Sequence, residues 1–402
     1  MEKGNSIFAD RVKNLGTETA FLVAAKAAAH SAAGNTVYPF HLGDMDLKTP
    51  ENIIEATYKA MLAGKTGYNP NAGIPELRQA LADEFNKTRK TAYSLKNVSV
   101  QPGGKPVIAK FLRAFMNPGD EVLYPNPGFP IYESLIRFHG GVAVPYGIVP
   151  GDGNYTFDID GLEKSITPRT RLLIVNDLHN PTSAECSKEE RRRIAEIAVR
   201  HNLMVLLDEA YFDIRYEGKS ASLVSEPGMA ERSVILYTFS KRFAMTGWRI
   251  GAALGPERVM DIISTMNVNE ESCTNHFIQY GALEALTGDQ KQVKENLEIL
   301  RKRRDLCVEM LNSITGVSCY APHATFYVYP DVSEAMHNKG FSEYEPFLDA
   351  VLQNTGVSMC ARTHFGSLLP GETGKNLRLA YSGIDLSGIE EGLSRLKNYL
   401  ER

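Results

Sequence analysis

A lysine boxed by hydroxyl groups and glycines marks the second half of the chain. Residues 238–251 read TFSKRFAMTGWRIG, with Lys241 directly after a predicted strand and Arg249 eight positions later. A lysine whose pKa is lowered by its surroundings can form a Schiff base with a carbonyl group. The hydroxyls of Thr238 and Ser240 and the guanidinium of Arg249 suit a phosphate beside it. A surface turn that happens to contain Ser-Lys is the competing interpretation. The choice between the two depends on what other segments of the chain supply.

Two further segments follow predicted strands, at the edge where open α/β sheets carry their functional groups. Residues 102–105 (PGGK) come after strand 98–101 and open a helix, where backbone N–H groups and the helix dipole attract an anion. Asn180 follows strand 172–175, and its amide can both donate and accept a hydrogen bond. Taken alone, each segment also fits an ordinary Gly-Gly or Asn-Pro turn.

Asp208 ends another predicted strand and is followed three residues later by Tyr211. A carboxylate at the end of a buried apolar strand costs free energy unless a positive group compensates it. A protonated pyridine nitrogen would be such a group, whereas a helix cap or a structural salt bridge is the alternative. An Asn and a Tyr would suit a phenolic oxygen, Lys241 an aldehyde, and Thr238 with Arg249 a phosphate. Together these groups predict pyridoxal 5'-phosphate as the cofactor.

The composition is that of an ordinary globular protein, with 43% hydrophobic and 23% charged residues among 402. The 48 acidic and 44 basic side chains give a net charge of -4, which does not support binding to nucleic acid or membranes through net charge. No segment predicts a transmembrane helix, and Lys26 and His30 interrupt the apolar run at 19–33, against a signal peptide. The five cysteines form no CxxC pair, so we expect reduced thiols, no metal site and a cytoplasmic location.

Alternating apolar strands and helical patterns begin at residue 98 and indicate an α/β domain with a largely parallel sheet covered on both faces. A helical zone at 257–314 separates two sets of strands. These are 98–101, 121–124, 142–146, 172–175, 203–207, 234–238 and 250–254, then 317–320, 325–329, 356–359 and 376–381. We expect a large cofactor-binding domain at 49–295, a small α+β domain at 296–402, and an N-terminal segment at 1–48 that packs with the small domain.

The order and spacing of these segments resemble the class I/II aminotransferases, which are fold-type I pyridoxal-phosphate enzymes similar to aspartate aminotransferase. The resemblance runs from about residue 42 to 381 and rests on the Asn-Pro-Thr, Asp-x-x-Tyr and Ser-Lys-x7-Arg-x-Gly spacings. It implies that Lys241 holds the cofactor as a Schiff base and then moves the proton at the substrate α-carbon. Asp208 would pair with the pyridine nitrogen, and Asn180 and Tyr211 with the phenolic oxygen. The implied phosphate ligands are Gly104, Lys105, Thr238 and Arg249.

The same resemblance implies roles for residues outside these motifs. Phe129 would stack on the cofactor ring. Gly43, Asn180 and Arg378 would bind the substrate, with Arg378 holding the α-carboxylate through two hydrogen bonds. Tyr68 would reach the phosphate of a neighbouring subunit, which implies a homodimer with shared sites.

Several positions depart from the family pattern. Leu178 replaces the usual proline two residues before the key asparagine, and Ser183 replaces the glycine after Asn-Pro-Thr. Residues 270–276 (EESCTNH) replace a hydroxyl-rich segment that borders the substrate space in relatives, so the identity of the substrate stays open. His179 and His276 could touch substrate, although a packing or surface position is the interpretation we favour.

We therefore predict an aminotransferase that moves an amino group between an L-amino acid and a 2-oxo acid by a ping-pong mechanism. The alternative is a lyase or synthase that eliminates a β- or γ-substituent with the same cofactor. A non-catalytic regulator on this fold is a third class, and both the presence of Lys241 and the lack of basic character in the N-terminal residues argue against it. The expected partners are small molecules, without nucleic acid or membrane.

Overall fold

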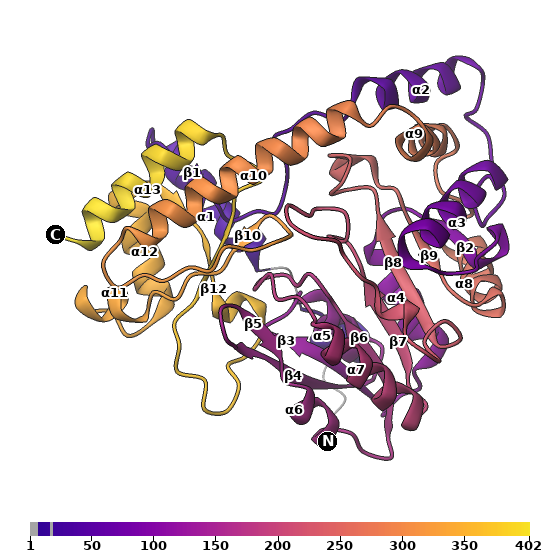
Figure 1. The fold of residues 1–402 in the computed structure, drawn as a ribbon, viewed down its shortest axis with the longest axis horizontal. Coiled ribbons are helices and arrows are strands. Elements are labelled where there is room, and N and C mark those ends of the chain that lie inside the picture. Colours follow the sequence, from indigo (N-terminus) through magenta and orange to yellow (C-terminus); the bar gives the residue numbers. More distant parts are fainter. Residues whose placement is uncertain (1–6, 17–18) are drawn as a thin grey trace.

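The computed structural model describes residues 7–16 and 19–402 and shows two lobes side by side (Figure 1). The larger lobe is built on an eight-stranded sheet with the strand order β2-β9-β8-β7-β6-β3-β4-β5. Its strands are β2 (Val98–Gln101), β3 (Glu121–Asn126), β4 (Val142–Pro150), β5 (Tyr155–Phe157), β6 (Thr170–Val175), β7 (Met204–Asp208), β8 (Ser233–Thr238) and β9 (Gly251–Leu254). Within this sheet, β9 and β5 run in the opposite direction to the other six strands. The predicted α/β fold with a mostly parallel, mixed sheet is confirmed.

The central strands are buried on both faces, which explains their continuous apolar sequences. Along β6, Leu172 and Ile174 point to one side of the sheet, whereas Leu173 and Val175 point to the other. This alternation follows from the two-residue period of a strand. Because helices cover both faces, the four consecutive positions 172–175 all carry apolar side chains.

Helices before and after the strands form the outer layers and the small lobe (Figure 1). They are α1 (Ala20–Ala32), α2 (Glu51–Leu62), α3 (Pro75–Arg89), α4 (Lys105–Phe115), α5 (Ile131–Phe138), α6 (Ile159–Lys164), α7 (Lys188–Arg200), α8 (Glu257–Glu270), α9 (His276–Thr287), α10 (Lys291–Asn312), α11 (Ser333–Asn338), α12 (Tyr344–Thr355) and α13 (Leu386–Leu400). Their ends carry ordinary signals: Ser187 and Glu190 form a capping box at the start of α7. The predicted helical zone at 257–314 is thus three helices, of which α10 extends towards the small lobe.

Short strands hold the small lobe together and attach the N-terminal segment to it. β10 (Tyr327–Val328), β13 (Leu377–Ala380) and β12 (Cys360–Ala361) form an antiparallel sheet. β1 (Tyr38–Pro39) pairs in parallel with β11 (Val357–Ser358), so residues from opposite ends of the chain share one sheet. The helix α10 is continuous across residues 295–296. The division into 1–48, 49–295 and 296–402 stays a prediction, and residues 1–6 and 17–18 lie outside the described part.

One predicted strand is wrong. At 317–320 only Ser318 makes an isolated bridge, to Asp331. The backbone N–H of Cys319 donates instead to the side chain of Asn312 at 2.8 Å, so it cannot join a strand.

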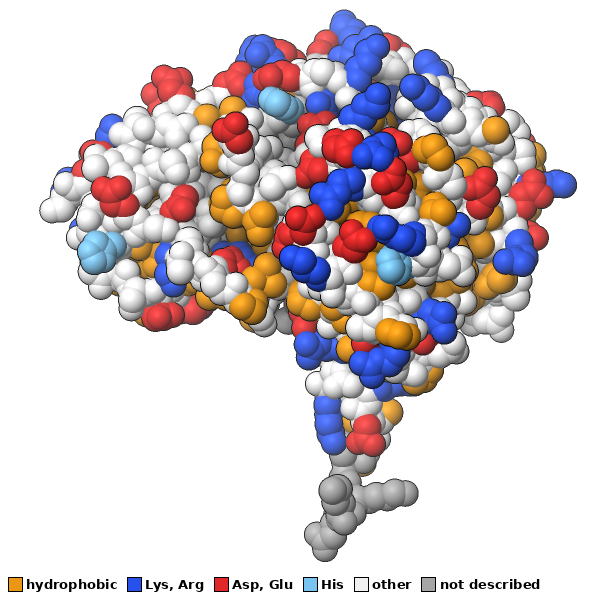
Figure 2. All heavy atoms as spheres, turned by 60° about the horizontal axis from the view of Figure 1, so that its bottom comes forward, with side chains coloured by type: hydrophobic (Ala, Val, Ile, Leu, Met, Phe, Trp, Pro, Cys, Tyr) orange, Lys and Arg blue, Asp and Glu red, His pale blue; other side chains and the backbone are white. Residues whose placement is uncertain are grey.

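The surface carries mixed charges. Acidic and basic side chains are interspersed over the face drawn in Figure 2. Over the described ranges, the helices include none with the length and apolar character needed to cross a bilayer. All five cysteines lie within the described residues, and none of them forms a disulfide.

Candidate active site at the carboxyl edge of the sheet

A cavity of about 590 Å³ opens at the carboxyl ends of the parallel strands. Its walls come from the segments after β2, β3, β6, β7 and β8, from the loop after β1, and from β10 and β13 of the small lobe. Every residue predicted for the site lines this cavity except Tyr68: Gly43, Gly104, Lys105, Phe129, Asn180, Asp208, Tyr211, Thr238, Lys241, Arg249 and Arg378. The fold therefore brings together residues from distant segments, while the role of each stays a prediction.

Lys241 lies in the turn directly after β8. Its ammonium group donates a hydrogen bond to the carbonyl oxygen of Gly43 at 2.8 Å and lies 5.4 Å from the ring centroid of Phe326. Gly43 has no room for a side chain, because a Cβ there would lie 2.3 Å from the hydroxyl of Tyr327. The amine is thus held against the N-terminal loop, where an aldehyde in the cavity can meet it.

An anion cradle lies at the start of α4. Gly103 has φ +100°, a conformation that favours glycine, and a Cβ on it would lie 2.1 Å from Nη2 of Arg249. Nη1 of Arg249 donates to the carbonyl oxygen of Thr246 at 2.8 Å. The hydroxyl of Thr238 donates to that of Ser240 at 2.8 Å. A helix N-terminus, a guanidinium and two hydroxyls thus converge, as binding of a phosphate requires.

Asp208 is a buried carboxyl group at the end of β7. It accepts hydrogen bonds from the hydroxyl of Tyr132 at 2.6 Å and from the backbone N–H of Ala210 at 3.2 Å. Burial raises the pKa of Asp208 above its ordinary value, and the hydrogen bond from Tyr132 opposes this rise. A cation placed against the carboxylate would favour its charged form. The environment of Asp208 therefore fits a protonated pyridine nitrogen.

Arg378 is buried on β13 and contacts the loop after β6. Its Nη1 donates to Oδ1 of Asn180 at 3.2 Å, and its Nη2 donates to the carbonyl oxygen of His41. Its Nε is buried and has no hydrogen-bond partner in the described part of the chain. A buried donor without a partner is costly. A substrate carboxylate reaching this end of the cavity would supply the missing acceptor.

Two tyrosines form part of another wall of the cavity. The hydroxyls of Tyr211 and Tyr327 lie 2.6 Å apart, and both residues line the cavity. Burial raises the pKa of Tyr211 well above its ordinary value, so this hydroxyl keeps its proton and can donate it in a hydrogen bond. This property fits the predicted contact of Tyr211 with a phenolic oxygen.

Comparison with known proteins decides the family. Residues 36–396 match the family model of aminotransferase class I and II. The chain belongs to this family. Members of this family use pyridoxal 5'-phosphate, and this aminotransferase is a pyridoxal-phosphate enzyme whose cavity fits the cofactor at its phosphate, pyridine and aldehyde positions.

Its relatives include several aspartate aminotransferases. The aspartate aminotransferase of Musicola paradisiaca is 35% identical over 93% of this chain and 92% of the relative. The aspartate/prephenate aminotransferase of Cereibacter sphaeroides is 34% identical over 93% and 94%. The solved aspartate aminotransferase of Thermus thermophilus with maleate superposes with a TM-score of 0.89 at 31% identity, over 98% of this chain and 99% of that one.

Leu178 and Ser183, which depart from the family pattern, are accommodated by the backbone of the loop that carries Asn180. Leu178 and Ser183 adopt left-handed conformations, with φ values of 57° and 59°. Asp177 accepts the N–H of Leu178 at 2.9 Å, and the hydroxyl of Ser183 donates to the carbonyl oxygen of Tyr327 at 3.0 Å. These local hydrogen bonds support a loop in which Asn180 still faces the cavity.

The segment 270–276 does not line the cavity of its own chain. Instead, Glu271 pairs with Lys110, a fully buried lysine on α4, and Glu270 accepts two hydrogen bonds from Arg113. The acidic pair thus joins α8 to α4 in this aminotransferase. Because each carboxylate has a cationic partner, the segment adds little net negative charge.

Tyr68 and the two histidines that could have touched substrate, His179 and His276, lie away from the cavity. His179 is buried, its Nδ1 lies 2.9 Å from the hydroxyl of Thr182, and burial lowers its pKa to about 3. His276 stacks on Tyr280 with 5.7 Å between ring centroids. Both histidines therefore pack against neighbouring side chains and do not line the cavity. Tyr68 is 88% exposed, so it does not complete the site of its own chain.

Sequence reasoning missed several wall residues of this aminotransferase. Tyr132 on α5 and Tyr327 on β10 hydrogen-bond to predicted site residues, and Asn176 donates to the carbonyl oxygen of Asp208 at 3.0 Å. A tyrosine at an apolar position of a helix or strand resembles any core residue, so it gives no signal. Asn176 could have been found, because it follows β6 directly at the carboxyl edge of the sheet.

Proposed function

We propose that this aminotransferase takes its amino group from a dicarboxylic amino acid such as aspartate. The observation that carries the proposal is the presence of two cationic side chains, Arg378 and Lys105, on different walls of one cavity. Arg378 would hold the α-carboxylate, and Lys105 would attract the second carboxylate of the donor.

The position of Lys105 supports this division. It is the first residue of α4, and its ammonium lies 5.6 Å from the ring centroid of Phe129, the residue proposed to stack on the cofactor. We propose the backbone of Lys105 as a phosphate ligand, so that its ammonium group, on the Phe129 side of the cavity, would attract the second carboxylate. Arg249 and Lys241 would be occupied by the phosphate and the aldehyde.

The relatives support a dicarboxylic substrate as well. Those at 34–35% identity are named for aspartate, alone or together with prephenate, and the solved Thermus thermophilus enzyme holds maleate, itself a dicarboxylate. The two glutamates of the segment 270–276 do not oppose this proposal, since Lys110 and Arg113 neutralise them.

The remaining side chains would divide the chemistry among them. The bound cofactor supplies an electron sink for the α-carbon. Lys241 would take the proton from that carbon as a base and then, as an acid, deliver it to the carbon on the other side of the amino nitrogen. Asp208 would keep its charge opposite the pyridine nitrogen, with Tyr132 holding it in place. Arg378 and Asn180, linked by their hydrogen bond, would fix the orientation of the substrate.

A homodimer is part of the proposal. α2 exposes Ile54, Tyr58, Met61 and Leu62, and Tyr68 follows a few residues later, also exposed. Apolar side chains gathered on one helix favour a subunit contact. Tyr68 would then reach the phosphate of the neighbouring site. The five cysteines form no disulfide among the described residues, which supports a reducing compartment, so we propose the cytoplasm as the location.

The proposal is tested with single turnovers of purified holoenzyme, using aspartate and alanine separately as donors. Lys105→Met should lower kcat/KM for aspartate by about 100-fold, because a charged contact is lost, and change the value for alanine by less than about threefold. Lys96→Met is the matched control, since Lys96 is exposed shortly before β2. An equal loss for both donors, or no loss for aspartate, would contradict the assignment.

A further inference from the structure

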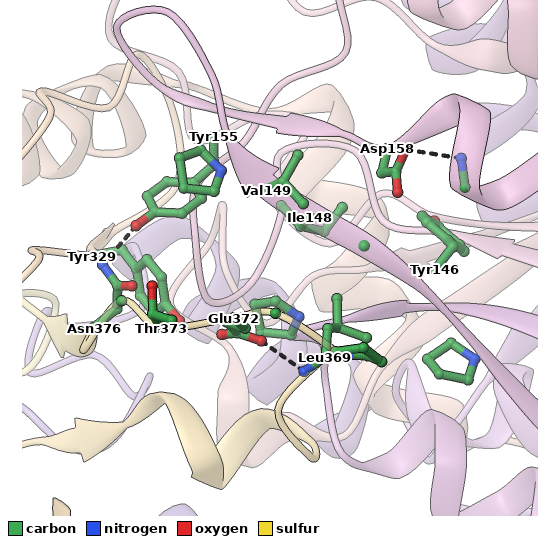
Figure 3. Close-up of a pocket in the computed structure, with 18 of the residues that line it drawn as sticks. Tyr146, Ile148, Val149, Tyr155, Asp158, Tyr329, Leu369, Glu372, Thr373 and Asn376 are labelled. Atoms are coloured by element: carbon green, nitrogen blue, oxygen red, sulfur yellow. Dashed lines mark hydrogen bonds between the residues drawn. The ribbon is translucent and has the colours of Figure 1, made fainter.

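A second cavity of about 440 Å³ lies on the outer edge of the large sheet (Figure 3). It is formed between β4 and β5 on one side and the Gly- and Pro-rich loop 369–374 of the small lobe on the other. It shares no lining residue with the catalytic cavity. Its volume is in the range of small-molecule sites.

One end of this cavity is aromatic. Tyr155 and Tyr329 pack edge to face with 5.1 Å between ring centroids. The amide of Asn376 donates to the hydroxyl of Tyr155 at 2.6 Å, as the dashed line in Figure 3 shows. The hydroxyl of Tyr329 is buried and has no hydrogen-bond partner within residues 7–16 and 19–402. This end would therefore accept a flat ring that carries a hydrogen-bonding atom.

The middle of the cavity is apolar. Ile148, Val149 and Leu369 line it, together with four proline rings. Gly147 opens the space further, because a Cβ there would lie 3.3 Å from Leu369 and 3.4 Å from Asp158. Proline and aliphatic side chains stack well on the face of an aromatic ring.

An acidic residue, Asp158, lies at the opposite end from Tyr155 (Figure 3). The other charged residue that lines the cavity, Glu372, lies between Thr373 and Leu369 (Figure 3). Glu372 is neutralised by two hydrogen bonds from the buried Arg362, at 2.6 and 2.8 Å. Asp158 caps α6 through one oxygen, which accepts the N–H of Gly161 at 2.8 Å. Its carboxylate has a second oxygen, so it can also face a cation.

From this arrangement we propose that the cavity binds a planar aromatic molecule bearing a cationic nitrogen, with the ring near Tyr155 and the cation near Asp158. The site is separate from the catalytic cavity and independent of the proposed substrate. Each wall of this cavity is close in sequence to a residue proposed for the catalytic site. Pro127 lies two positions before Phe129, and Asn376 lies two positions before Arg378. A ligand there would touch both lobes at once.

Benzamidine is a suitable probe, because it joins a ring to a cation and does not form Schiff bases. Titration calorimetry on the holoenzyme should give binding with a dissociation constant of about 1 mM or lower. Benzamide, which has the same shape without the charge, should bind about tenfold more weakly, and benzoate more weakly still. Absence of benzamidine binding, or an equal affinity for benzoate, would overturn the proposal.

Variants locate the site. Asp158→Asn keeps a residue that can cap α6 and removes only the charge, so benzamidine should lose about tenfold in affinity while benzamide changes little. Asp160→Asn, an exposed position on the same helix, is its control. Thr373→Trp should fill the cavity and abolish binding of both probes, whereas Leu368→Trp, in the same loop outside the lining, should not.

Two further results separate this site from the catalytic one. Arg378→Ala should leave benzamidine affinity unchanged, and Thr373→Trp should leave single-turnover kcat/KM within about twofold of the parent. Loss of benzamidine binding in Arg378→Ala would place the probe in the catalytic cavity and refute the second site. Retained binding in both Asp158→Asn and Thr373→Trp would refute it as well.

Discussion

The guanidinium of Arg378 donates a hydrogen bond to the side-chain oxygen of Asn180 at 3.2 Å. These residues lie on different lobes, Arg378 on β13 and Asn180 in the loop after β6. The backbone N–H of Asn180 in turn donates to Asn176, whose amide donates to the carbonyl oxygen of Asp208. A chain of hydrogen bonds therefore connects the proposed carboxylate site to the proposed pyridine site.

Replacing Arg378 should mainly weaken amino-acid binding. Arg378→Lys keeps a positive charge but loses the planar fork, so we expect KM for aspartate to rise by about 100-fold with the cofactor still bound. Steady-state kinetics and the visible absorbance of the cofactor measure the two effects. Arg395→Lys, on the exposed side of α13, is the control. Loss of the cofactor in Arg378→Lys would show that the carboxylate role is wrong.

Lys241→Ala should abolish turnover and the visible absorbance that comes from cofactor attached to the protein. The amine is the proposed point of attachment and the proposed base, so removing it stops both functions. Absorbance spectra of the purified protein and a transamination assay provide the two measurements. Lys59→Ala, an exposed change on α2, should alter neither. Turnover retained by Lys241→Ala without added amine would exclude Lys241 from the mechanism.

Tyr132→Phe should weaken cofactor binding. Its hydroxyl holds down the pKa of Asp208, so its removal raises that pKa further and weakens the carboxylate as a partner for a cation. We expect about a tenfold loss in cofactor affinity, measured by titrating the apoprotein with pyridoxal phosphate. Tyr124→Phe, a buried tyrosine on β3, tests for a general packing effect. Equal losses in both variants would leave Tyr132 with a packing role only.

Asp177 should make the protein less stable as the pH rises from 3.8 to about 7. Burial raises the pKa of this carboxyl from 3.8 to about 7, so the folded state binds the proton more tightly than the unfolded state. The resulting stability is complete below pH 3.8 and is lost as the pH rises to 7, by roughly 4 kcal/mol in all.

Asp177→Asn keeps an oxygen for the N–H groups of Leu178 and Cys186 and cannot ionise. Urea unfolding at about pH 5 and about pH 8 should therefore show a smaller loss of stability in the variant than in the parent. Asp160→Asn, an exposed carboxylate paired with Arg193, should keep the parent's pH dependence. An unchanged dependence in Asp177→Asn would rule out this carboxyl as its source.

The core of the fold was predictable because its central strands contain continuous apolar runs, such as 172–175, which lies within the observed strand β6 (Thr170–Val175). The short strands β1 and β5 were not. β1, with two residues, exists only because β11 lies beside it, and β5 because it pairs with β4. Local sequence cannot contain that information, since the partner lies elsewhere in the chain.

The residues of the site also divide into those that the sequence could predict and those that it could not. Lys241, Asp208 and Arg249 were found because polar groups after buried strands at these spacings are unusual. Tyr132 was not, because its hydroxyl meets Asp208 only through the packing of α5 against the sheet. The sequence also did not show that the glutamates of segment 270–276 pair with cations on α4. Lys110 occupies a position of α4 that looks like an ordinary surface lysine.

The pairing of β1 with β11 also bears on how the protein is made. Neither two-residue strand is stable without the other, and the loop that brings Gly43 to Lys241 starts immediately after β1. A ribosome must therefore synthesise the chain past residue 358 before that loop is anchored. We expect nascent chains released before this point to capture the cofactor poorly, even though the whole large sheet has already left the exit tunnel.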